Sequence, residues 1–348
     1  MNEKDIKHVR IWYWTGAALV MLILTVGGIT RLTDSGLSMV DWNPIMGAVP
    51  PLSEQAWEET FESYKQFPEV RERNAGMTLP EFKYIFFWEY LHRMLGRLAG
   101  FVFLIPFGWF LIKKKMDRTQ VKRALILLLL GSAQGLMGWY MVQSGLVDVP
   151  YVSHYRLAAH LFLSMEIFGT CVLFALDLRR QANQISTAVH SLKKWGWVFM
   201  GLLILQITWG AFVAGLNAGH LYNTFPKMFG YWLPPELWVI QPVWLNIFEN
   251  PATTQFIHRV AGTLLGLLAV AMWINVYLRK DSWQVKKWVF AIFTVVLIQY
   301  AAGVFTLIYH VPVWLGVLHQ AIAFVLFGIV IGFLHFLSKV EVSYETVS

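Results

Sequence analysis

Charged residues and cysteine are both scarce in this 348-residue chain. Only 14% of the residues are charged and 57% are hydrophobic, whereas about a quarter of the residues of an ordinary soluble domain carry a charge. This composition excludes a typical soluble domain and favours a protein of the lipid bilayer. The single cysteine, Cys171, has no second thiol to pair with, which excludes an intramolecular disulfide or a redox pair of cysteines.

The N-terminus lacks the features of a removable targeting segment. Its first apolar run is long and has no small-residue cleavage site, and no Arg- and Ser-rich transit peptide precedes it. We therefore expect this run to be a membrane span.

Apolar runs long enough to cross a bilayer as helices, about 20 residues each, recur eight times. The sequence predicts an all-α integral membrane protein with eight transmembrane helices, near residues 11–30, 84–112, 123–143, 155–177, 195–216, 254–278, 288–308 and 314–337. The second run is long enough for its outer end to project beyond the hydrocarbon.

The net charge of +7 comes from basic residues with a topological pattern. If eight helices alternate in direction, these residues fall on one side of the membrane. The positive-inside rule then puts both termini in the cytoplasm of a bacterial inner membrane, with a mitochondrial matrix as the weaker alternative. A nucleic-acid surface is not indicated, because the charges are spread over short separate segments: Lys4, Lys7, Arg10; Lys113, Lys114, Lys115, Arg118, Lys122, Arg123; Arg179, Arg180, Lys193, Lys194; Arg279, Lys280, Lys286, Lys287; and Lys339.

Two outer loops are long enough to have structure of their own. In the loop 31–83, Ser53 begins a pattern typical of a capped amphipathic helix on the membrane surface. The loop 217–253 is rich in Gly, Pro and aromatic residues and poor in charge, which predicts an interfacial cap packed on the bundle.

The chain contains an internal repeat. EYLHRMLGR at 89–97 matches QFIHRVAGT at 255–263, and Gln134 and Gly138 match Gln299 and Gly303, at offsets of 166 and 165 positions. The near-constant offset predicts two tandem four-helix bundles, residues 1–183 and 184–348, related by a pseudo-two-fold axis along the membrane normal.

Four histidines stand at one predicted depth. Each lies 19 to 21 residues before the first basic residue that ends its helix: His92, His160, His258 and His319. At 1.5 Å per residue they form one layer roughly 30 Å from the cytoplasmic side, near the outer face. Pairs of imidazoles across a four-helix bundle are a common way to hold haem iron, so two porphyrin sites are predicted, one per half. Zinc is disfavoured because no further ligands converge.

Charged side chains lie beside these histidines. Arg93, Arg97 and Arg259 suit haem propionates. Glu89 precedes His92 by one helical turn, while Gln255 holds that position in the second half. The difference indicates that the first half does chemistry and that the second holds a cofactor or relays electrons. Two simpler alternatives are an i, i+4 ion pair between Glu89 and Arg93 and drift after duplication.

The segments GGITRLTDSGLSMVDWNPIMGAVPPLSE, MTLPEFKYIFFWEYLHRMLGRLAGF and HRVAGTLLGL, together with the four histidines, resemble the haem A synthase family. The likeness is to the branch with a long first outer loop, found in proteobacteria and mitochondria. The other branch has a cysteine pair in an outer loop, and no thiol role proposed there carries over to this chain.

This resemblance implies oxidation of the C8 methyl of haem O to the formyl group of haem A, through a hydroxymethyl stage, for cytochrome oxidase. It implies a haem b cofactor on His258 and His319, substrate haem O near His92 and His160, and a catalytic role for Glu89 in stabilising charge or managing protons. Haem O synthase is a candidate partner, the electron donor is unidentified, and a homo-oligomer is compatible with the sequence.

Two other classes remain open at this point. A dihaem b-type membrane protein would transfer electrons, although two haems at one depth do not favour transfer across the bilayer. A haem transporter or chaperone would bind haem without changing it.

Overall fold

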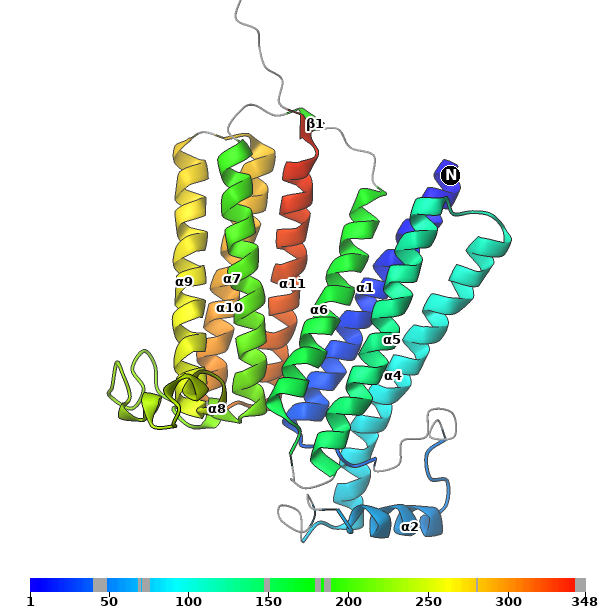
Figure 1. Cartoon of the computed structure of the whole chain (residues 1–348), viewed down its shortest axis with the longest axis vertical. Coiled ribbons are helices and arrows are strands. Elements are labelled where there is room, and N and C mark those ends of the chain that lie inside the picture. The colour runs from blue at the N-terminus through cyan, green and yellow to red at the C-terminus, as the bar shows by residue number, and fades with distance from the viewer. Residues whose placement is uncertain are drawn as a thin grey trace, which may run out of the picture. The chain divides into compact units, whose positions relative to one another are not determined.

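The computed structural model describes residues 1–39, 49–67, 70, 76–146, 151–178, 183–184, 189–279 and 281–341. Eight helices in these ranges are long and apolar enough to cross a membrane, which confirms the predicted number of spans and makes the chain a multi-pass membrane protein. Figure 1 labels them: α1 Glu3–Leu32, α4 Leu79–Ile112, α5 Arg118–Leu146, α6 His154–Asp177, α7 Val189–Gly215, α9 Pro251–Leu278, α10 Trp283–Ile308 and α11 Val313–Ser338.

Several parts of the sequence interpretation fall outside the described residues. They are Arg179, Arg180 and Lys280, from the topology argument, and residues 40–48, 68–69 and 71–75 of the first outer loop.

Contacts divide the chain into two compact units, one of Met1–Ala17 with Phe168–Ser348 and one of Ala18–Ile167. In the first unit, α7, α9, α10 and α11 form a closed ring, because α10 packs on α9 and α11, and α7 packs on the same two helices. In the second unit, α4 packs on α5. The duplication boundary between residues 183 and 184 stays a prediction.

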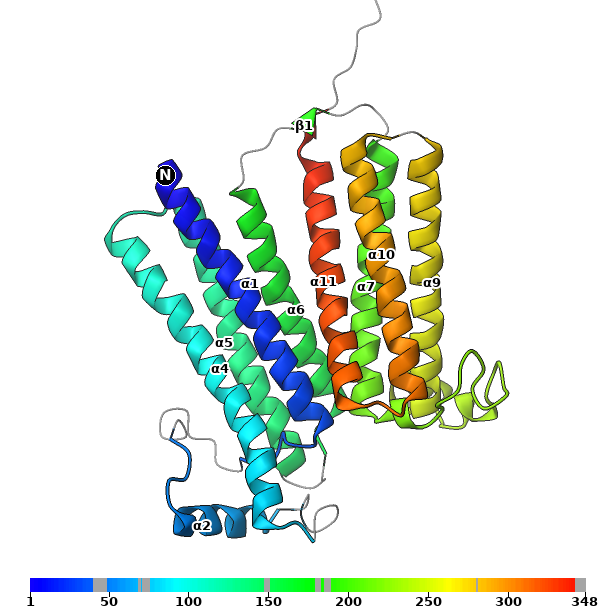
Figure 2. The same ribbon diagram turned by 180° about the vertical axis from the view of Figure 1, so that it is seen from behind.

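The first outer loop contains the predicted amphipathic helix, α2 (Glu54–Tyr64). Ser53 caps it by accepting a hydrogen bond from the Ala56 amide at 3.2 Å. Phe61 and Tyr64 stack on Phe82 near the start of α4, with ring centroids 5.0 and 5.1 Å away. This aromatic cluster explains why α4 begins beyond the end of α1, as Figure 2 shows: its first turns pack on α2 rather than on the bundle.

The second long outer loop is built from short turns of helix and packs on the start of α9. Its elements are η2 Ala218–His220, η3 Pro235–Trp238, η4 Val243–Leu245 and α8 Asn246–Glu249. Asn250 caps α9 and donates to the Glu236 carbonyl at 2.6 Å, and Thr253 donates to the Leu237 carbonyl. In Figure 1 the loop also projects sideways from the end of α9. Trp232, Trp238 and Trp244 are exposed there.

Tyr222 makes a hydrogen bond to another residue of this loop. Tyr222 is buried and its hydroxyl donates to Glu236 Oε2 at 2.6 Å. Burial, with the hydrogen bond and the negative charge of Glu236, raises the pKa of Tyr222 to about 12. The phenol is therefore protonated at every physiological pH, as its donor role requires.

The remaining regular structure is a parallel pair of two-residue strands, β1 (Asn183–Gln184) and β2 (Val340–Glu341). The described chain is thus all-α apart from this pair. Cys171 of α6 is buried, and a Cβ on Gly16 of α1 would lie 3.2 Å from its sulfur. It packs as a small apolar residue.

Candidate functional site

The second-half histidines face one another across the helical ring. His258 of α9 and His319 of α11 have ring centroids 6.3 Å apart and planes inclined by 77°. Two imidazoles that share one metal ion at the usual metal–nitrogen distance of about 2.0 to 2.1 Å would have centroids roughly 6 Å apart. The pair therefore fits bis-histidine coordination of a haem iron.

Each ring of this pair lies against a glycine of a neighbouring helix. A Cβ on Gly210 of α7 would come within 3.2 Å of His258, and one on Gly303 of α10 within 2.7 Å of His319. Gln206 and Gln299, four residues before these glycines, place their side-chain nitrogens 3.3 and 3.4 Å from the two Nε2 atoms.

The first-half histidines are held in a related way. A Cβ on Gly27 of α1 would lie 2.8 Å from His92, and one on Gly138 of α5 would lie 3.2 Å from His160. Gln134 places its side-chain nitrogen 3.2 Å from His160 Nε2.

Sequence reasoning missed Gln206, Gly210 and Gly27 as neighbours of the histidines. A signal was present, because a Gln-x-x-x-Gly pattern recurs as QGLMG at 134–138, QITWG at 206–210 and QYAAG at 299–303. In α1 the matching stretch is ILTVG at 23–27, where isoleucine replaces glutamine.

Glu89 is buried, with 3% of its surface exposed, and is fully engaged. It accepts hydrogen bonds from the Ser38 hydroxyl at 2.7 Å and the Met39 amide at 2.8 Å. It also pairs with Arg93 at 2.5 Å, and Arg93 donates to the Met39 carbonyl at 2.8 Å. The ion pair of the simpler sequence interpretation is thus present, and it ties the start of the first outer loop to α4.

Gln255 occupies the matching position of the second half, but it donates hydrogen bonds to its outer loop where Glu89 accepts them. Its side-chain nitrogen donates to the carbonyls of Ala218 at 2.8 Å and Tyr222 at 3.3 Å. Arg259 donates to Tyr222 and Thr224 carbonyls and to Gln255. The same two helix positions therefore anchor the outer loop in both halves.

The arginines expected to meet propionates have other contacts. Arg93 and Arg259 bind loop carbonyls, as described, and Arg97 lies with its Nη1 3.9 Å from Met94 Sδ. Their role toward propionates stays a prediction. Glu166 of α6 is half-buried, and we assign it no role.

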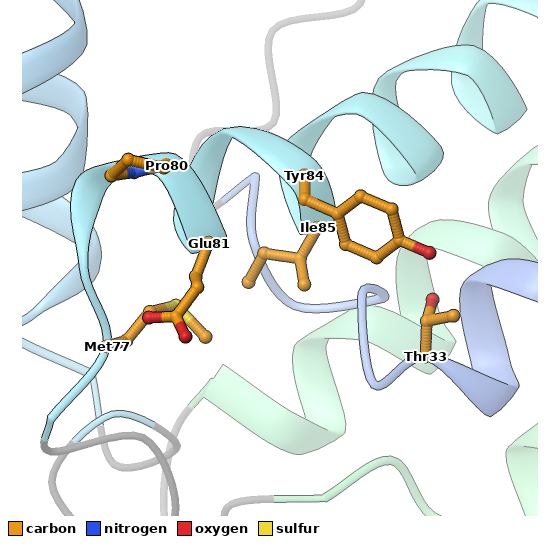
Figure 3. Close-up of a pocket in the computed structure, with 6 residues that line it drawn as sticks. All are labelled: Thr33, Met77, Pro80, Glu81, Tyr84 and Ile85. Carbon is orange, nitrogen blue, oxygen red and sulfur yellow. The ribbon is translucent and has the colours of Figure 1, made fainter.

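A surface pocket near the start of α4 is separate from the histidines. Figure 3 shows its lining residues, of which Glu81 is engaged with Thr78 in the capping box of α4. The full lining is Thr33, Met77, Pro80, Glu81, Tyr84 and Ile85. None of the eight predicted site residues is among them.

Within the described residues, no three His, Cys, Asp or Glu side chains gather as a metal site. Two facing imidazoles match the number of protein ligands that a haem iron takes, whereas a structural zinc site needs four. The facing pair of His258 and His319 therefore suits haem.

Comparison with known proteins gives the family. The family described as cytochrome oxidase assembly protein matches residues 10–331. A relative from Nitrosospira multiformis, named haem A synthase, is 43% identical over 92% of this chain and 91% of its own. Haem A synthases of a Wolbachia of Brugia malayi and of Flavobacterium psychrophilum are 41% and 42% identical, each over 97% of this chain and 99% and 100% of their own. This eight-span chain therefore belongs to the cytochrome oxidase assembly protein family in which those haem A synthases are found.

Proposed function

We propose that this protein is a haem A synthase, which oxidises the C8 methyl of haem O to a formyl group and so supplies haem A for cytochrome oxidase. The observation that carries the proposal is the pair of histidine sites, one in each half, of which only the first has a carboxylate one turn from its histidine. Near-full-length similarity to proteins named haem A synthase supports it.

The two halves divide the work. His258 and His319 are the residues that would hold haem b, and their centroid separation of 6.3 Å fits two axial imidazoles. When bound, haem b supplies a one-electron redox centre. His92 and His160 would bind the iron of the substrate, haem O, in the first half, where Arg97 would pair with a propionate.

Glu89 is the proposed catalytic carboxylate. Its two donors and Arg93 hold the carboxylate in one place, so a fixed negative charge lies one helical turn from His92. Such a charge would stabilise positive charge that develops on the substrate, or would accept a proton from it.

The setting of the reaction follows from the spans. We propose a bacterial inner membrane location with both termini in the cytoplasm and both haem sites near the outer face. An apolar substrate would then enter from the bilayer, with haem O synthase as the candidate supplier. The electron donor is unidentified, and a homo-oligomer is compatible with the exposed apolar helix faces.

The substitution Glu89→Gln tests this assignment. We expect the purified variant to retain the b-type haem spectrum and to yield haem A at least about 100-fold more slowly, the scale usual for loss of an acid or base group. Extracted haems should be identified by mass. An unchanged yield of the formyl-bearing haem would contradict the role.

The matched control is Ser38→Ala, which removes one hydrogen bond to Glu89 but keeps its charge. If Glu89 acts chiefly as a loop anchor, Ser38→Ala and Glu89→Gln should reduce the yield to similar extents. If its charge matters, only Glu89→Gln should abolish it.

Histidine pairs in both halves also suit a dihaem electron-transfer protein, which is the second candidate. Mass analysis of the haems extracted after expression with haem O present distinguishes the two. An electron carrier, like a haem transporter or chaperone, would release haem without a formyl group.

A further inference from the structure

Each of the four histidines lies next to a glycine on the membrane helix that precedes its own helix in the chain. The closeness of approach is graded. The distance from a Cβ added to the glycine to the nearest atom of the imidazole ring is 2.7 Å for Gly303 with His319 and 2.8 Å for Gly27 with His92. It is 3.2 Å both for Gly138 with His160 and for Gly210 with His258. Real Cβ atoms essentially never approach another atom within 3.0 Å. Two of the four positions therefore admit only glycine with the ring in place.

The contact of His319 with α10 also determines which ring nitrogen of this histidine carries the hydrogen. His319 Nδ1 lies 3.1 Å from the backbone carbonyl of Gln299, four residues before Gly303. A carbonyl only accepts, so Nδ1 carries the hydrogen and Nε2 carries the lone pair. The Gln299 side-chain nitrogen, 3.4 Å from Nε2, is then a donor facing an acceptor. This is the tautomer that an imidazole needs to bind a metal through Nε2.

Not every glycine of these helices lies in close contact with another helix. Nearby glycines of the same helices, Gly135 in α5 and Gly201 in α7, would meet no atom within 4 Å if they had a Cβ, and the same holds for Gly266 in α9. Close approaches at other positions involve bulky apolar side chains, such as Trp288 opposite Gly332, and one polar side chain, Gln206, whose nitrogen would lie 3.1 Å from a Cβ on Gly262.

We propose that Gly27, Gly138, Gly210 and Gly303 are positioning residues for haem, because each lets an imidazole lie against a neighbouring helix. At Gly303 the carbonyl of Gln299, four residues earlier, also orients the ring so that Nε2 carries the lone pair that would bind iron. The inference rests on the proposed function, because it assigns the four histidines to haem iron. It adds that the backbone of α1, α5, α7 and α10, and not only the four histidine helices, orients the ligands.

The test uses the full chain purified in detergent after expression in cells that make haem. Gly303→Ala and Gly210→Ala are compared with Gly201→Ala and Gly266→Ala. Three quantities are measured: haem per protein, the electron paramagnetic resonance signal of the low-spin oxidised haem, and carbon monoxide binding to the reduced haem. Carbon monoxide binds only where an axial position is open, so it reports a displaced histidine and not a general loss of stability.

We expect Gly303→Ala to lower haem retention by about 10- to 100-fold, the usual cost of disturbing the partner of a metal-bound histidine. Haem that remains should bind carbon monoxide. Gly210→Ala, with its looser 3.2 Å approach, should keep more haem but shift the low-spin signal. Gly201→Ala and Gly266→Ala should match the wild type in all three measurements.

The proposal is overturned if Gly303→Ala and Gly210→Ala keep wild-type haem content and signal and bind no carbon monoxide, or if the controls lose haem equally. If Gly303→Ala does not fold, the spectrum of Gly210→Ala decides. A wild-type protein without haem would instead refute the proposed function. In the first half, Gly138→Ala against Gly135→Ala applies the same comparison to bound haem O, with its retention on purification as the readout.

Discussion

The two histidine sites are built on the same plan and differ at several positions. In both halves an arginine one residue after the histidine, together with the residue three before it, holds the incoming outer loop. That residue is Glu89 in the first half and Gln255 in the second. Four residues before the glycine, the helix beside His92 has Ile23, whereas the helix beside His258 has Gln206, whose side-chain nitrogen lies 3.3 Å from His258 Nε2. The scaffold is therefore shared, and the chemical difference lies in a few side chains.

The difference extends to the direction of the hydrogen bonds. Glu89 accepts from a hydroxyl and an amide, while Gln255 donates to two carbonyls. The first loop therefore supplies hydrogen-bond donors to Glu89, and the second supplies carbonyl acceptors to Gln255. An acidic residue at position 89 is thus part of a matched set with Ser38 and Met39, which argues against drift of one side chain alone.

The largest effect should come from removing the proposed cofactor ligands. We expect His258→Ala and His319→Ala to abolish the b-type spectrum, because an iron with one axial imidazole is bound far less tightly. His92→Ala and His160→Ala should keep that spectrum and lose the formyl product. Reduced-minus-oxidised spectra measure this. Loss of the spectrum with His92→Ala but not with His258→Ala would reverse the assignment of the two halves.

Making the second half resemble the first should destabilise it. Gln255→Glu would set a carboxylate oxygen against the Ala218 carbonyl, which now accepts a hydrogen bond at 2.8 Å. We expect a loss of about 1 to 3 kcal/mol in the free energy of unfolding, the usual cost of a buried polar group left unpaired. Chemical unfolding in detergent provides the measurement.

The control for this substitution is Gln66→Glu, the same chemical change at an exposed position. It should leave the unfolding free energy within about 0.5 kcal/mol of the wild type. Equal stability of Gln255→Glu and the wild type would mean that the second loop tolerates either a donor or an acceptor at position 255. The loop and this residue would then not be a matched set.

The helix caps give a smaller contrast between the halves. Asn250, which caps α9, is 4% exposed and also binds Glu236 and Asn246, whereas Thr78, which begins α4, shares an exposed capping box with Glu81. Asn250→Ala should cost about 1 to 3 kcal/mol and Thr78→Ala about 1 kcal/mol or less. Thermal unfolding midpoints rank the two, and a larger effect for Thr78→Ala would contradict the expected order.

The smallest effect concerns alkaline pH. The pKa of Tyr222, about 12 in the folded chain, exceeds its value of about 10 in an unfolded one. Its contribution to stability is therefore complete below about pH 10 and is lost as the pH rises through about 12. The unfolding midpoint of Tyr222→Phe should fall less between pH 9 and about 11 than that of the wild type. Tyr309→Phe, at an exposed tyrosine, should follow the wild type.

Much of this architecture is predictable from the sequence because a bilayer imposes simple rules. Span length and hydropathy locate all eight membrane helices, and the Ser53 cap locates α2. The His-Arg repeat marks His92 and His258, and the common distance to the basic helix ends adds His160 and His319. Periodicity does not give which residue of a neighbouring helix lies against a ring. The recurring Gln-x-x-x-Gly pattern marks Gln206 and Gly210 as a repeated element, but only the packed helices show that Gly27 and Gly210 lie against His92 and His258. Likewise, a single carboxylate in a sequence does not reveal that Ser38 and Met39, about 50 positions earlier, supply its donors.

The buried position of Cys171 has a practical consequence. The residue is 4% exposed and its sulfur lies near Gly16, so thiol reagents applied to the folded protein should react far more slowly with it than with a cysteine placed on the surface. The natural chain is thereby already suited to single-site labelling. A fluorophore or spin label attached through a cysteine in place of Trp232 or Trp244, on the exposed outer loop, would report on that loop alone and on whether lipid or water surrounds it.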